Sequence, residues 1–145
     1  MSSYVLDCSL AMAWCFADQT DGVSTAALDA LADESENESP RAVVPAIWPS
    51  EVLNVVLVAE RHKKLTPAQS ARFLQLLGSL PIDVDVDAAS IYANAKILAL
   101  GRSYRLSSYD ASYLELAMRM GLPLATHDKK LAAACGAVGV KLVGR

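Results

Sequence analysis

The sequence is poor in the residues that build zinc sites and disulfide frameworks. It has 3 cysteines and 2 histidines in 145 residues, with no C-x-x-C pair and no regular Cys/His spacing. This argues against a zinc site. An odd number of cysteines without a framework is typical of a reducing compartment, so we expect a cytoplasmic protein.

Long apolar runs and an excess of positive charge are also missing. No stretch reaches the roughly 18 apolar residues of a membrane span. The first residues, MSSYVLDCSL, lack the basic region of a signal peptide. We therefore expect no membrane association. The net charge is -3, so any contact with nucleic acid must depend on local basic patches or bound cations.

Short apolar runs alternate regularly with helical segments along the chain. The composition, 53% hydrophobic and 20% charged, suits a single folded domain over residues 1–145. Strands are expected at 4–6, 42–44, 82–84, 123–125 and 140–143. Helices are expected at 9–17, 23–32, 48–63, 67–77, 87–101, 107–120 and 129–135. The fifth helix should be capped by Asp87 and end at Gly101. This alternation predicts an α/β fold with three layers, α/β/α, around a central, mostly parallel sheet of about five strands.

Four acidic residues stand at helix starts. Asp7 directly follows the first strand, Asp128 follows the fourth by three residues, and Glu51 and Asp110 lie in the first turns of their helices. Each acid alone suits a helix cap or the helix dipole. Asp7 and Asp128 also lie beyond the carboxyl ends of strands, where open parallel sheets form their sites.

Taken together, these acids predict a metal site. Clustered carboxylates repel one another, and a bound hard cation removes that cost. Oxygen ligands without paired histidine or cysteine favour Mg²⁺, with Mn²⁺ as an alternative.

At these positions the sequence resembles the PIN-domain family, and within it the VapC toxins of bacterial toxin–antitoxin pairs. The matching segments are YVLDCS, WPSEVLNVV, LSSYDASYLELA and LATHDKKL, which hold the four acids in family order. The resemblance implies a single PIN-like nuclease domain, a magnesium-dependent endoribonuclease that hydrolyses RNA phosphodiesters with metal-activated water. It also implies a homodimer and a cognate antitoxin that binds the toxin in a hetero-oligomer.

The same resemblance assigns roles to single residues. Asp7 and Asp110 are the first choice as metal ligands. Glu51 and Asp128 complete the catalytic quartet, binding the metal directly or through water. Three further positions match supporting polar residues, which would orient the carboxylates: Ser9, Asn54 and Thr126.

Binding of RNA and of partner chains requires further surfaces. Four cations near the acids are candidates for phosphate contact, although for each one singly we prefer ordinary surface charge as the interpretation: Arg102, Arg105, Lys129 and Lys130. The basic cluster 61–64 suits the negative end of its helix, an interpretation we prefer to RNA contact. His127 is interpreted as a loop residue. The apolar stretches 14–16 and 52–59 are expected to line a dimer interface or an antitoxin groove, with core packing as the equal alternative.

Other functions stay open at this point. A PIN-like module could hold RNA or a partner without cutting, and a PIN nuclease could process RNA in a housekeeping role. A phosphotransfer receiver also places acids at strand ends, but it needs paired acids after the first strand, where Asp7 stands alone.

Overall fold

A computed structural model describes residues 3–32, 40–86 and 91–144, without the side chains of 91–93. Its strands are β1 (Tyr4–Leu6), β2 (Ala42–Pro45), β3 (Ile82–Asp85) and β4 (Leu124–Ala125). They form one parallel sheet in the order β3-β2-β1-β4. In the described ranges the expected fifth strand is reduced to one bridge, Leu124 to Leu142. Because β4 has only two residues, it offers little edge for further pairing.

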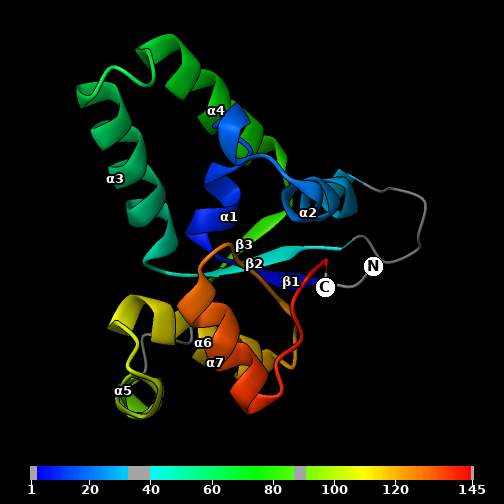
Figure 1. The fold of residues 1–145 in the computed structure, drawn as a ribbon, viewed down its shortest axis with the longest axis vertical. Helices are drawn as coiled ribbons and strands as arrows, with labels where there is room; N and C mark the ends of the chain where they lie inside the picture. Colours follow the sequence, from blue (N-terminus) through cyan, green and yellow to red (C-terminus); the bar gives the residue numbers. More distant parts are fainter. Residues whose placement is uncertain (1–2, 33–39, 87–90, 145) are drawn as a thin grey trace.

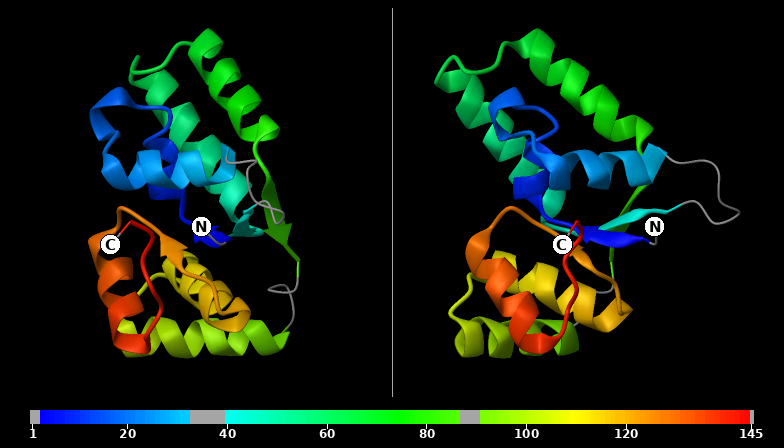
Figure 2. Two further views of the ribbon diagram at one scale, coloured as in Figure 1. Left: turned by 90° about the vertical axis from the view of Figure 1, so that its right-hand side faces the viewer. Right: turned by 45° about the vertical axis from the view of Figure 1, so that its right-hand side comes forward.

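Helices cover both faces of this sheet. They are α1 (Cys8–Met12), α2 (Gly22–Ala32), α3 (Trp48–Arg61), α4 (Pro67–Ser79), α5 (Ile91–Tyr104), α6 (Ser108–Met120) and α7 (Lys129–Val138), with a short 3-10 turn, η1 (Ala17–Gln19). Figures 1 and 2 show α1 to α4 on one side and α5 to α7 on the other. The predicted three-layer α/β/α fold is thus confirmed. Within the described ranges, every helix is too short or too polar to cross a bilayer.

The end of α5 differs from the sequence prediction. The helix continues past Gly101 to Tyr104, so the expected end at Gly101 is wrong. The carbonyl of Gly101 accepts a hydrogen bond from the backbone N–H of Leu106 at 3.0 Å. A Cβ at position 101 would meet the Leu106 carbonyl oxygen at 3.2 Å. Glycine therefore allows a close backbone approach here and does not end the helix. The expected cap, Asp87, lies outside the described residues.

Two helix ends carry a cation where glycine is usual. Lys63, just after α3, has φ 58°, and Arg105, just after α5, has φ 53°. After α3, the N–H of Lys64 donates to the carbonyl of Ala59, and the N–H of Lys63 donates to that of Glu60. This is the Schellman arrangement, in which a left-handed residue follows the helix. Both lysine and arginine pay a steric cost in that conformation.

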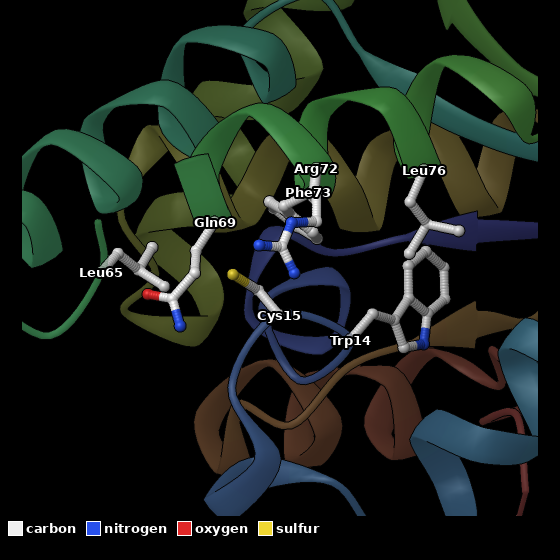
Figure 3. Close-up of a pocket in the computed structure, with 7 residues that line it drawn as sticks. All are labelled: Trp14, Cys15, Leu65, Gln69, Arg72, Phe73 and Leu76. Carbon is white, nitrogen blue, oxygen red and sulfur yellow. The ribbon is translucent and has the colours of Figure 1, made fainter. Parts of the chain in front are cut away.

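The core surrounds the central strand β1, whose three residues are fully buried. Figure 3 shows how the chain after α1 packs below α4. There, Trp14 and Cys15 line a cavity of about 260 Å³ together with α4 residues such as Phe73. The indole N–H of Trp14 donates to the carbonyl of Ser24 at 2.9 Å. Two of the three residues in the stretch 14–16, Trp14 and Cys15, are therefore partly buried against the protein's own core.

Candidate active site

The register of the sheet brings two segments that are far apart in the sequence together at Asp7. In the β1–β4 pair, Leu6 lies opposite Ala125, and the N–H of Asp7 donates to the Ala125 carbonyl at 3.0 Å. The next residue after β4, Thr126, therefore lies beside Asp7. Both positions are at the carboxyl end of the parallel sheet, the edge that the sequence predicted for the site.

Asp7 is a buried carboxylate held by two hydroxyl groups. Its side chain is 4% exposed, and its Oδ2 accepts hydrogen bonds from Ser9 Oγ and Thr126 Oγ1, each at 2.6 Å. Burial raises the pKa of Asp7, the two hydroxyl bonds oppose this, and the charge of Asp128 adds to the rise. Asp7 occupies the cap position of α1 but makes no side-chain cap bond. Its carboxylate is therefore turned to the site and not to the helix.

Glu51 projects from the first turn of α3 and is oriented by a tyrosine. The hydroxyl of Tyr113, on α6, donates to Glu51 Oε1 at 2.8 Å. Burial raises the pKa of Glu51, as do the charges of Asp7 and Asp110, while the Tyr113 bond lowers it. Tyr113 itself is fully buried, so this contact fixes one oxygen of Glu51 against the protein interior.

Asp110 and Asp128 stand at the starts of α6 and α7. Ser107 caps α6 by accepting from the N–H of Asp110 at 3.1 Å, so the Asp110 side chain is not the cap. Asp128 does cap α7, because its Oδ1 accepts from the N–H of Leu131 at 2.8 Å. Its own N–H donates to Thr126 Oγ1 at 2.9 Å. Burial raises the pKa of Asp110, and the charges of Asp128 and Asp7 raise it further.

All four acids line a single pocket of about 600 Å³. It opens beyond the carboxyl ends of β1, β2 and β4, with Cys8 also in its wall. Burial, together with the charges of Glu51 and Asp7, raises the pKa of the Cys8 thiol to about 12. Cys8 is therefore no nucleophile at neutral pH. In the described part of the chain, no lysine or arginine forms an ion pair with any of the four acids, so the pocket is strongly negative.

This donor set fits a hard divalent cation. It offers carboxylate and hydroxyl oxygens, which suit Mg²⁺ or Mn²⁺ better than zinc. Asp7 is a buried carboxylate facing other acids, and a cation would compensate that charge. Among the described residues, no three His, Cys, Asp or Glu side chains are already grouped as a metal site. The acids therefore share a pocket without converging on one point.

Sequence reasoning missed three residues at this pocket. Asp21 and His127 both line it, and the imidazole Nε2 of His127 lies 3.0 Å from Asp21 Oδ2. The N–H of His127 also donates to Ser9 Oγ at 3.1 Å, so this residue has more contacts than a plain loop residue. Tyr113 is the third. Its position three residues after Asp110, on the same helix face, was the available signal.

Of the other expected site residues, only Ser9 is among the lining residues of the pocket. Ser9 lines the pocket and Thr126 contacts Asp7, but Asn54 is exposed on α3 and is not among the lining residues. The four candidate RNA-binding cations are all exposed. Of these, Lys130 is electrostatically linked to the site, because its charge opposes the rise in the pKa of Asp110. The roles of Asn54 and of the four cations stay predictions.

Two solved structures resemble the chain at low sequence identity, which shows the fold alone. PAE2754 from Pyrobaculum aerophilum is 22% identical with a TM-score of 0.65, and the match covers 92% of this chain and 79% of that one. A chain in a toxin–antitoxin complex from Klebsiella pneumoniae is 21% identical with a TM-score of 0.60, covering 90% and 91%. No curated protein sequence matches. The family model for the PIN domain matches residues 4–137.

Proposed function

The chain belongs to the PIN-domain family, whose members are generally nucleases, and from this premise we propose that it is a magnesium-dependent endoribonuclease. We further propose that this single domain is the toxin of a toxin–antitoxin pair, acting in the cytoplasm. The observation that carries the nuclease proposal is Asp7, a buried carboxylate with two hydroxyl partners that shares an open pocket with three other acids.

Each acid has a distinct place in this proposal. Asp7 and Asp110 would hold the cation directly, and Glu51 and Asp128 directly or through water. A divalent cation bound there lowers the pKa of water and stabilises negative charge on a phosphate. Ser9 and Thr126 keep the Asp7 carboxylate in one orientation, and Tyr113 does the same for Glu51. Such support keeps ligands in place before the metal binds.

The toxin proposal has separate support. The fold resembles a chain of a toxin–antitoxin complex from Klebsiella pneumoniae, which suggests a cognate antitoxin as a partner here too. An RNA substrate would contact the cations around the pocket. Among these cations, the charge of Lys130 acts on Asp110 and lowers its pKa. A homodimer would use α3, where Leu53 and Leu57 are 46% and 48% exposed.

Cleavage of RNA tests the nuclease proposal. The purified chain should cut cellular RNA in the presence of Mg²⁺ and stop when a chelator is in excess. Asp7→Asn and Asp110→Asn should lower the rate by about 100-fold or more, because each removes a carboxylate that would hold the cation. The matched control is Asp29→Asn, at an exposed acid of α2 outside the pocket, which should cut like the unaltered chain.

Three outcomes would separate the proposals. Full cleavage in excess chelator would contradict the magnesium site. RNA binding without cleavage at any Mg²⁺ concentration would favour the non-catalytic binding module. Cleavage without growth arrest when the chain is expressed, and without a neighbouring gene whose product neutralises it, would favour a housekeeping nuclease.

A further inference from the structure

A second cavity continues the acidic pocket along α3. It has a volume of about 250 Å³ and shares three lining residues with the acidic pocket, so the two adjoin. The shared residues are Phe16, Gln19 and Val55. The remaining lining residues are Asp18, Val58, Ala59, His62 and Lys64. We name the combined hollow, from the acidic pocket to Lys64, the α3 channel.

One face of α3 forms the floor of the α3 channel. Val55, Ala59 and His62 come 4, 8 and 11 residues after Glu51. This spacing places all four residues on one side of the helix. This face spans about 16 Å, or about five nucleotides at the ~3.4 Å rise of a stacked strand. Along it the chemistry changes from acidic to apolar to basic.

The opposite wall is held in place by several hydrogen bonds. Phe16 lies between the end of α1 and η1, and its N–H donates to the carbonyl of Met12 at 3.0 Å. Thr20 Oγ1 donates to the carbonyl of Ala13 at 3.0 Å. Asp21 is paired with His127 across the acidic pocket. The backbone that carries the half-buried Phe16 is therefore held where the two cavities meet.

We propose that the α3 channel binds a single RNA strand, with one base against Phe16 and a backbone phosphate at His62 and Lys64. This inference rests on the proposed function, because it names how the substrate of the acidic site is held. Sites for single strands combine positive charges that follow the backbone with aromatic rings on which bases stack. The α3 channel has both, in the order that a strand leaving the acidic site would meet them.

The charge distribution decides how the strand lies. Asp18, in η1, lines the same cavity as His62 and Lys64, so phosphate is repelled from η1 and attracted to the end of α3. Bases then point toward Phe16 and Gln19, whose amide can donate to and accept from a base edge. A protein segment with acidic and apolar residues is the competing occupant, and the experiment separates the two.

Binding of labelled oligonucleotides tests this inference. Eight-nucleotide single-stranded RNA of random sequence, carrying fluorescein, is titrated with the chain in excess chelator, and anisotropy gives the Kd. Phe16→Leu should weaken binding by about 5- to 100-fold, because one stacked base is lost. Phe16→Trp should bind as the unaltered chain. Lys64→Ala should lower the slope of log Kd against log salt by about 0.7, the loss of one phosphate contact.

The same titration provides the control and the results that would overturn the inference. Lys141→Ala, an exposed lysine outside the α3 channel, should leave the salt slope unchanged. Equal binding by the unaltered chain, Phe16→Leu and Lys64→Ala would overturn the inference. So would tight binding of a labelled peptide of four Glu-Leu repeats with no binding of RNA. Cleavage of cellular RNA in Mg²⁺, measured on the same samples, tests the nuclease proposal separately, since binding in chelator requires no chemistry.

Discussion

Asp7 shows how a single residue can oppose folding and serve a site at once. Its carboxylate is buried, its pKa is raised above the ordinary value, and its hydrogen bonds come from neutral groups, the hydroxyls of Ser9 and Thr126 and the backbone of Cys8. In the metal-free chain, the folded state therefore holds its proton to a higher pH than the unfolded state does. Functional sites commonly carry such a cost in stability.

We expect Asp7→Asn to stabilise the metal-free chain at neutral pH, because it removes a buried charge. A raised pKa in the folded state means that the free energy of unfolding falls as pH rises through the window above the ordinary value of 3.8. Asn cannot ionise, so the gain should be largest at neutral pH and vanish below pH ~3.8. Urea unfolding from pH 3 to 8 in chelator measures this.

The exposed control, Asp29→Asn, should show no such gain. A variant Asp7→Asn that is less stable than the unaltered chain at pH 7, or one with the same pH dependence, would contradict the expectation. Addition of Mg²⁺ should reverse the order of stability, because only the unaltered chain keeps its full set of ligands for the cation.

At the residue scale, the acids were predictable and their partners only in part. Asp7 and Asp128 could be found because both follow short apolar runs, and strand ends are readable from the sequence. Ser9 and Thr126 came from family resemblance, and the structure places both against Asp7. The pair of Asp21 with His127 joins residues 106 positions apart, a contact set by the folding of the loop after α1 and not by local spacing.

At the element scale, the ends of α3 and α5 carry a cost that could be removed. Lys63 and Arg105 have left-handed backbones, which cost a residue with a side chain about 1 kcal/mol. We expect Lys63→Gly and Arg105→Gly each to raise the free energy of unfolding by up to ~1 kcal/mol. Thermal or urea unfolding measures the change.

Matched neighbours make this prediction specific. Lys64→Gly and Arg102→Gly change the same residue types at ordinary backbone angles, so they should destabilise, the helical Arg102 by about 1 kcal/mol. Equal effects at both members of a pair would show that the left-handed conformation carries no cost. If Arg105→Gly also weakens RNA binding, the arginine is retained for contact at the expense of stability.

Helix starts were easier to predict than helix ends. The capping box of Thr66 and Gln69 is present at the start of α4, with both reciprocal hydrogen bonds, because its partners are three residues apart. Gly121 ends α6 in the left-handed conformation, directly after residue 120, where the sequence predicted the end of this helix. Gly101, like Gly121, lies where the sequence predicts the end of a helix. Its function depends on the approach of the Leu106 carbonyl, which only the turn after α5 determines.

On the scale of the whole molecule, the alternation of strands and helices was sufficient to predict the three layers. It was insufficient for the edge of the sheet, where the expected strand at 140–143 makes a single bridge. It also left the role of the stretch 52–59 open. The structure divides that stretch: Val52, Val56 and Ala59 are buried in the core, whereas Leu53 and Leu57 face outward.

The outward face of α3 should govern self-association. We expect Leu57→Asp to shift a dimer to monomer, because it places a charge in an apolar contact. The free energy of unfolding of the monomer should change by no more than ~0.5 kcal/mol, since the side chain is exposed. Light scattering after size-exclusion chromatography gives the mass. Leu98→Asp on α5, 56% exposed, is the control and should leave the mass unchanged.

A chain that is monomeric before the substitution would contradict a homodimer through this face. A dimer that survives Leu57→Asp would place the interface elsewhere.

The pairing of Asp7 with Thr126 has a consequence for how the chain is made. Asp7, which directly follows β1, is synthesised 119 residues before Thr126, and Asp128 comes still later. A nascent chain that stops before β4 therefore has neither the second hydroxyl bond to Asp7 nor the fourth acid of the pocket. If the site cuts RNA, the messenger and ribosome that produce it face no complete catalyst until Asp128 has been translated.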